Sequence, residues 1–233
     1  MGEGRGIKGM RVRIDPRVKA DFPNLNILST MIRDMNIRSE DPELEAFKDN
    51  AIRDVRAKYN VDSLKDVPSI RAYRNFLWRI GIDPTKNRPA SEALIRRVLL
   101  GGSLPKINTF VDSLNLASML SEVAIASFDL SKVMGETILR YAVKGESFYG
   151  IGMSKPLILE GNELIISDEG GVIAIYPYRD SERTKITEGT RDALLIFCGV
   201  PGISLEMLHD AMDMAIKIIT RFCGGLSIAM EAE

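Results

Sequence analysis

The sequence predicts an α+β fold, in which a helical N-terminal part packs on a mostly antiparallel β-sheet core and a C-terminal helix closes the domain. Apolar residues recur at helical spacing through the first half of the chain. From about residue 123 to 199 the pattern changes to short apolar runs separated by turn residues, which is typical of strands. Helices, then strands, then a final helix indicate α+β and not a series of βαβ units.

The first predicted helices lie before residue 60. Residues 16–36 are predicted to be helical, with an interruption at Pro23. Asp41 followed by Pro42 is a good N-cap and first-turn pair, so a second helix is predicted over 42–59. Its apolar stripe consists of Leu44, Phe47, Ala51, Val55 and Tyr59.

Three further helical segments follow. The stretch "SIRAYRNFLWRIGI", residues 69–82, is amphipathic and is closed by Gly81 and Pro84. The stretch "RPASEALIRRVLLGG", residues 88–102, has a proline in its first turn and a glycine pair as its stop. In "INTFVDSLNLASM", residues 107–119, a helix places three polar side chains on one face. These side chains are Asn108, Asp112 and Asn115, and they are read either as capping groups or as a polar stripe that faces a ligand.

Six short strands and one helix complete the prediction. The strands are "VAIASF", "ETILRYAV", "PLILE", "ELIIS", "VIAIYPY" and "ALLIFC". Gly and Asn in "EGN" and "DEGG" suit tight connections between them. The closing helix, about 204–222, has apolar residues at alternating spacings of three and four, from Leu205 to Phe222.

Composition narrows the class of protein. The chain has 233 residues, 45% hydrophobic, and a net charge of -1, so it is not a uniformly basic nucleic-acid binder. No apolar run is long enough for a membrane span, and "MGEGRGIKGMRVRI" lacks a signal core, so a cytoplasmic protein with no membrane partner is expected. One histidine and two distant cysteines argue against zinc, and we expect no metal and no cofactor. The absence of glutamine favours a thermophilic source.

Positive charge collects between residues 71 and 106. This segment has eight basic and two acidic residues, a net charge of +6, which leaves -7 for the rest of the chain. With Tyr73, Phe76 and Trp78, the segment suits a surface that faces phosphates and stacks bases. The alternative is that the arginines pair with acidic residues elsewhere and the aromatic rings belong to the core.

A second polar segment, "RDSERTKITEGT" at 179–190, follows a hydrophobic strand. Hydroxyls and carboxylates in such a loop indicate either the rim of a pocket or a solvated loop that caps the next element. No GxSxG and no GxxxxGK[ST] is present, so the sequence shows neither a nucleophile elbow nor a P-loop.

Together the two polar segments resemble the editing domain of the phenylalanyl-tRNA synthetase beta subunit, its combined third and fourth B module. The matching residues are Ile107, Asn108, Val111, Asp112, Asn115, Phe128, Asp129, Asp168, Ser181, Glu182, Thr187 and Thr190. "RPASEALIRRVLLGG" is similar to the first helix of stand-alone relatives of this module. The resemblance covers about residues 70–200, so we expect an editing-domain-like part over 70–233 and a helical region over 1–69 packed against it.

The resemblance implies a module that binds the aminoacyl end of a tRNA and hydrolyses a wrong ester. It makes Glu182 the catalytic candidate, and it implies a pocket with Asn115 and Glu182 in one cleft. The predicted substrate-binding residues are Asn108, Asp112, Asn115, Tyr178, Arg179 and Thr187. The predicted RNA-binding residues are Arg88, Arg97 and Lys106. Ala126 stands where bacterial members carry a histidine, and "YPYRD" replaces a glycine pair, so Tyr178 and Arg179 narrow or recharge the pocket.

Three functions follow from this sequence. The first is a free-standing tRNA- or RNA-binding module that removes a mischarged amino acid in trans, without a covalent nucleophile. The second is a non-catalytic RNA-binding protein that uses the basic helices around Arg88 and Arg97. The third is a binder of a free amino acid or a related small metabolite.

Overall fold

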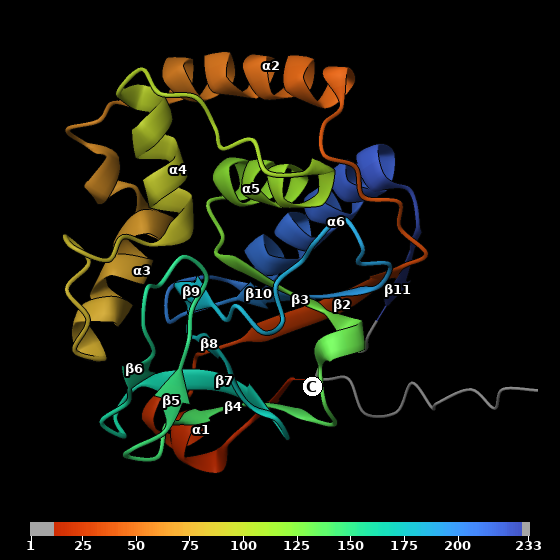
Figure 1. Cartoon of the computed structure of the whole chain (residues 1–233). Coiled ribbons are helices and arrows are strands. Elements are labelled where there is room, and N and C mark those ends of the chain that lie inside the picture. Colours follow the sequence, from red (N-terminus) through yellow and green to blue (C-terminus); the bar gives the residue numbers. More distant parts are fainter. Residues whose placement is uncertain (1–11, 230–233) are drawn as a thin grey trace, which may run out of the picture.

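A computed structural model describes residues 12–229. The opening segment, on which the expectation of no secretory signal rests, lies mostly outside these residues. In the view of Figure 1 two sheets lie below most of the helices, and the short first helix lies beside the lower sheet. The first sheet has the strand order β1-β4-β7-β8-β9, and the second has the order β11-β2-β10-β3. Among the described residues only β1 and β4 pair in parallel.

The elements follow the chain in this order: β1 (Val12–Ile14), α1 (Pro16–Asp21), β2 (Ile27–Arg33), α2 (Pro42–Lys58), η2 (Leu64–Asp66), α3 (Pro68–Arg79), α4 (Ala90–Leu99), α5 (Thr109–Ser121), β3 (Ile125–Asp129), η3 (Leu130–Lys132), β4 (Thr137–Tyr141), β5 (Ser147–Phe148), β6 (Leu157–Ile158), β7 (Leu164–Asp168), β8 (Gly171–Ile175), β9 (Arg179–Asp180), β10 (Ala193–Cys198), α6 (Leu205–Cys223) and β11 (Leu226–Ala229). The predicted α+β class, with helices on mostly antiparallel sheets and a helix near the C-terminus, is confirmed.

The helix prediction for residues 16–36 is wrong in its second half. Helix α1 ends at Asp21, and residues 27–33 form strand β2, which pairs with β10 and β11 at the centre of the second sheet. One face of β2, with Leu28, Thr30 and Ile32, is buried, and the other is only partly buried. Each face carries both apolar and polar residues, so the sequence lacks the alternation that marks a half-exposed strand. The predicted N-terminal region therefore shares a sheet with the rest of the chain.

The second helix begins as its sequence predicts. The Asp41 carboxylate accepts hydrogen bonds from the backbone N–H groups of Glu43 and Leu44, at 2.9 and 3.0 Å. Pro42 occupies the first turn, where its missing N–H leaves no bond unmade. The helix buries Leu44, Ala51 and Val55, as the apolar stripe predicts.

Helices α5 and α6 pack on each other, and α6 lies on strands β2 and β10 (Figure 1). Tyr73 of α3 joins the helices to this sheet through its buried hydroxyl. The hydroxyl donates to the carbonyl of Cys198 at 2.7 Å and accepts from the backbone N–H of Ala124 at 3.1 Å. Tyr73 is therefore part of the core, as one of the two interpretations of the basic segment expects.

Candidate functional site

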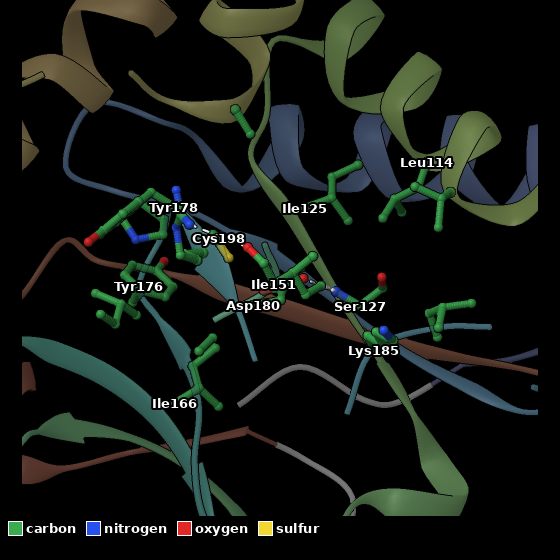
Figure 2. A pocket seen from close by; sticks show the side chains of 18 of the residues that line it. Leu114, Ile125, Ser127, Ile151, Ile166, Tyr176, Tyr178, Asp180, Lys185 and Cys198 are labelled. Atoms are coloured by element: carbon green, nitrogen blue, oxygen red, sulfur yellow. Dashed lines mark hydrogen bonds between the residues drawn. The ribbon is translucent and has the colours of Figure 1, made fainter. Parts of the chain in front are cut away.

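A cavity of about 410 Å³ opens between α5 and the two sheets (Figure 2). Its wall comes from segments far apart in the sequence: α5, β3, the end of β8 with β9, and the loop after β9. This volume lies within the range of small-molecule sites in proteins.

Most of the cavity wall is aliphatic. The branched aliphatic residues that line it are Ile107, Val111, Leu114, Ile125, Ile151, Ile166, Ile175 and Ile186. Alanine at positions 90, 126 and 174 leaves room between them. The polar residues are few: Asn115, Ser127, Tyr176, Tyr178, Arg179, Asp180 and Lys185, with the thiol of Cys198. A wall of this kind suits a ligand with an apolar portion and a small number of polar groups.

Asp180 is the acidic residue in this wall. It lies on β9, opposite Ala174 of β8, and its Oδ2 accepts a hydrogen bond from the backbone N–H of Ser127 at 3.2 Å. Among the described residues its second oxygen, Oδ1, has no hydrogen-bond partner, and the half-buried residue lines the cavity. Burial raises the pKa of Asp180 to about 7, and the single N–H donor offsets this only in part.

The three polar residues of α5 have separate roles. Asn108 is the N-cap, and its side-chain oxygen accepts from the backbone N–H of Val111 at 2.9 Å. Asp112 is buried, where it accepts from Lys48 Nζ at 2.8 Å and from the backbone N–H of Ile107 at 3.0 Å. Only Asn115 lines the cavity, and its side chain makes no hydrogen bond within the described part of the chain. One residue therefore caps the helix, one is in a buried ion pair and one faces the cavity, so the three do not form a single polar stripe toward a ligand.

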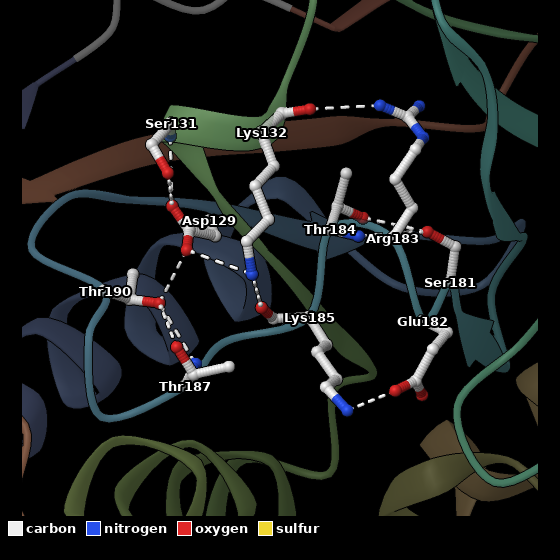
Figure 3. Close-up of polar contacts among 10 residues, drawn as sticks. All are labelled: Asp129, Ser131, Lys132, Ser181, Glu182, Arg183, Thr184, Lys185, Thr187 and Thr190. Carbon is white, nitrogen blue, oxygen red and sulfur yellow. Dashed lines mark hydrogen bonds and ion pairs between the residues drawn. The ribbon is translucent and has the colours of Figure 1, made fainter.

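In the polar segment after β8, too, some of the predicted site residues line the cavity and others do not. Tyr178 and Arg179 line the cavity, whereas Thr187 belongs to a hydroxyl network beside it (Figure 3). In that network the backbone N–H of Thr187 donates to Thr190 Oγ1 at 3.0 Å, and Thr190 donates to Asp129 Oδ2 at 2.8 Å. Its hydrogen bonds hold the end of β3 against the loop that precedes β10.

Glu182 does not line the cavity, so the expectation that Asn115 and Glu182 share one cleft is wrong. Beyond β9 the chain turns, because the Ser181 hydroxyl bonds to Thr184 and the Glu182 N–H donates to the carbonyl of Tyr149 at 2.9 Å. The Glu182 carboxylate pairs with Lys185 (Figure 3) and lies beside a separate hollow. Its catalytic role stays a prediction.

A second hollow, of about 390 Å³, adjoins the cavity and is basic. The residues that line it are Lys86, Asn87, Arg88, Ala93, Arg96, Arg97, Leu100, Tyr178 and Arg179. None of these is acidic, and Tyr178 and Arg179 line both the basic hollow and the cavity. Four of the eight basic residues of 71–106 therefore lie together beside the cavity, and one of them, Arg88, also lies 3.9 Å from Glu92.

The three predicted RNA-binding residues are placed differently. Arg88 and Arg97 line the basic hollow, where Arg97 Nε donates to the carbonyl of Ser103 at 2.6 Å. Lys106 lies apart from it, in an exposed ion pair with Glu40 at 2.5 Å. Sequence reasoning missed Asp180, Lys86 and Arg96 as site residues. The signal for Asp180 was its place next to Arg179, a predicted site residue, since both lie on β9 and both line the cavity.

The single histidine and the two cysteines do not form a cluster. His209 is exposed, and its Nδ1 lies 2.8 Å from the Leu205 carbonyl of its own helix. Cys198 and Cys223 are free and buried. Within residues 12–229 no group of three or more His, Cys, Asp or Glu side chains is arranged to hold a metal ion. In the same residues no helix has the length and apolarity to cross a membrane.

Comparison with known proteins gives one family. A model of the B3/4 domain matches residues 72–224. The chain is 24% identical over 206 residues to the phenylalanine–tRNA ligase beta subunit of Rhodopseudomonas palustris, covering 78% of this chain and 25% of that protein. It is 30% identical over 115 residues to the same subunit of Nocardia farcinica, covering 49% and 13%.

A solved structure shows the same fold. It is an N-terminal fragment of the phenylalanyl-tRNA synthetase beta subunit from Pyrococcus horikoshii, with a TM-score of 0.50 and 15% identity. The match covers 94% of this chain and 50% of that one. The chain spans about a quarter of the length of the R. palustris subunit, so the two share one module and not the whole protein.

Proposed function

Since the chain belongs to the B3/4 domain family, we propose that it binds the aminoacylated 3′ end of a tRNA and removes a wrong amino acid in trans. In this proposal the amino acid enters the cavity and the terminal nucleotides lie along the basic hollow. The phenylalanine–tRNA ligase subunits that the chain resembles support a tRNA as the partner.

The observation that carries the proposal is the wall shared by the two hollows. Tyr178 and Arg179 border an aliphatic cavity on one side and four further cations, Lys86, Arg88, Arg96 and Arg97, on the other. Phosphates of a nucleic acid require the cations, whereas the cavity suits an apolar side chain. A free amino acid needs no such cluster of cations, and an RNA without an amino acid needs no aliphatic cavity.

Tyr178 is half-buried between the two hollows. An aromatic ring at this place can stack on a base, and stacking contributes about 1–3 kcal/mol per base in single-strand binding. The terminal base of an RNA would then rest on Tyr178, with the following ester at Arg179.

Hydrolysis is the second half of the proposal. A pocket for one amino acid rejects a close analogue poorly, so a second site that accepts the error and exposes its ester to water improves accuracy. Glu182 lies outside the cavity, and we assign it a positioning role, in which it holds the ammonium group of Lys185. The Lys185 side chain itself lines the cavity.

The test is tRNA binding as a function of salt. The double variant Arg96→Glu/Arg97→Glu reverses two cations of the basic hollow, and Lys19→Glu/Lys217→Glu makes the same charge change at exposed positions outside both hollows. We expect the first variant to bind tRNA more weakly. The slope of log affinity against log salt should be less steep, by about 2. Equal binding by the two variants would contradict the proposal.

The hydrolytic half has its own measurement. Mischarged tRNA should lose its amino acid faster with the protein than without it, and Arg96→Glu/Arg97→Glu should abolish the difference. If tRNAs charged with a panel of wrong amino acids lose them no faster with the protein than without it, the chain does not hydrolyse the ester.

A second candidate function is binding of a free amino acid. Asn115 and Asp180 favour it, because both lie in the cavity wall with hydrogen-bonding capacity that the protein leaves unused. A ligand that binds the native state raises the melting temperature, so a thermal-shift panel of free amino acids tests this function. A rise that requires no RNA would favour it, and no rise at saturating concentrations would remove it.

A further inference from the structure

The cavity contains a carboxylate that the fold does not use. Asp180 Oδ2 has one donor, the Ser127 N–H at 3.2 Å, and Oδ1 has none among the described residues. Figure 2 shows Asp180 between Ser127 and Tyr176, with Cys198 close by. A carboxylate among aliphatic side chains is poorly solvated, and a cation that enters the cavity would compensate for this.

The cations of the wall are engaged elsewhere. The Lys185 ammonium group pairs with Glu182, and Arg179 Nη1 donates to the carbonyl of Ile151 at 3.3 Å. The other titratable groups that line the cavity are Tyr176, Tyr178 and Cys198, and burial raises the pKa of each, so they are neutral near pH 7. No side chain therefore neutralises Asp180 within the described part of the molecule.

We infer that Asp180 binds the α-ammonium group of an aminoacyl ester, while the aliphatic wall holds an aliphatic side chain such as that of leucine. This inference rests on the proposed function. Arg179 precedes Asp180 on β9 and lines both the cavity and the basic hollow, so Asp180 lies one residue from their boundary. In an aminoacyl ester the ammonium group is separated from the ester carbonyl by one carbon atom. With the ester carbonyl at the boundary between the cavity and the basic hollow, the ammonium group would therefore lie close to Asp180.

The ligand to use is leucinamide, which keeps the ammonium group and lacks the carboxylate of leucine. N-acetyl-leucinamide has the same side chain but no positive charge, and it is the matched control. Isothermal titration calorimetry with the whole chain measures both affinities. We expect leucinamide to bind at least about tenfold more tightly than the acetylated compound at neutral pH, because a charge-assisted hydrogen bond to a desolvated partner is strong.

The pH profile adds a second readout. With a pKa of about 7 for Asp180 and about 7.8 for the ligand amine, affinity for leucinamide should rise about fifteenfold between about pH 5.5 and about pH 7.5. Above about pH 8 it should fall again, since the ligand loses its charge. The acetylated compound should show neither change.

The variant Asp180→Asn keeps an oxygen for the Ser127 N–H and removes the charge. It should bind leucinamide no better than N-acetyl-leucinamide, whereas Asp210→Asn, an exposed change on α6, should behave as the wild type. If Asp180→Asn does not fold, the wild-type comparison of the two ligands across pH still decides the matter.

The outcomes separate this inference from the proposed function. Equal affinity for the two ligands, or a flat pH profile, overturns the role of Asp180 even if tRNA binds through the basic hollow. Discrimination between the ligands that follows the expected pH profile supports the role of Asp180, even if tRNA binding fails and the cavity binds a small amine.

Discussion

Replacing Lys48 by methionine should destabilise the chain strongly, because it breaks a buried ion pair. Lys48 and Asp112 are 3% exposed each, and Lys48 Nζ donates to Asp112 Oδ2 at 2.8 Å and to the carbonyl of Pro105 at 3.0 Å. Methionine fills the same space without the charge, so Asp112 keeps only the Ile107 N–H at 3.0 Å. Removing one partner of such a pair costs about 3–5 kcal/mol.

The assay is urea unfolding followed by circular dichroism. We expect Lys48→Met to lower the unfolding midpoint at an unchanged m-value, the signature of a pure change in stability. For a chain of 233 residues the same loss lowers the melting temperature by about 6–20 °C. Adding Asp112→Leu should restore most of the stability, since replacing both partners of a buried pair by apolar residues is often neutral.

The control is Lys58→Met. The Lys58 side chain is 61% exposed and pairs with Glu122 at 3.0 Å, so its loss should cost less than about 1 kcal/mol. An equal loss of unfolding free energy in Lys48→Met and Lys58→Met would show that the buried pair is no stronger than the exposed one. Because Asp112 lies one turn before Asn115, the pair also fixes the part of α5 that faces the cavity.

Three further predictions concern the site. Glu182→Gln should slow hydrolysis of a mischarged tRNA less than about tenfold, and a loss of about a hundredfold or more in a deacylation assay would instead make it a general base. Ala126→Leu should narrow the cavity and weaken leucinamide binding in calorimetry, while tRNA without an amino acid still binds; an unchanged affinity for leucinamide would place the ligand elsewhere. Since the folded-state pKa of Asp180 is raised to about 7, this group should lower the unfolding free energy as pH rises from about 4 to about 7. For Asp180→Asn, urea unfolding should show no such decrease of the unfolding free energy over this pH range. If the unfolding free energies of variant and wild type change with pH in parallel, this prediction is wrong.

Local sequence signals predicted the elements whose ends are marked by capping residues. Asp41 with Pro42 and Asn108 before α5 cap their helices as expected. Strand β2 was not predicted, because each of its faces mixes apolar and polar residues, and the alternation by which a strand is recognised is therefore missing. Its identity comes from pairing with β10, a contact between residues more than 150 positions apart.

The site was predicted only in part. Asn115, Tyr178 and Arg179 line the cavity, and Arg88 and Arg97 line the basic hollow, as their sequence segments indicate. Sequence order cannot show where a chain turns, and the turn after β9 carries Glu182 away from the cavity. Sequence order also cannot show that the Asp180 carboxylate has only one hydrogen-bond donor, because this depends on all the residues that pack around it in the folded chain.

The most direct test compares two tRNAs, one carrying leucine in a non-hydrolysable 3′-amide and one with a bare 3′ end. Burial of the leucine side chain contributes about 1.5–3 kcal/mol, so the leucyl form should bind tighter by about tenfold or more. Ala126→Leu should reduce this difference, and Arg96→Glu/Arg97→Glu should weaken binding of both forms. Equal affinity of the wild type for the charged and the bare tRNA would contradict the account.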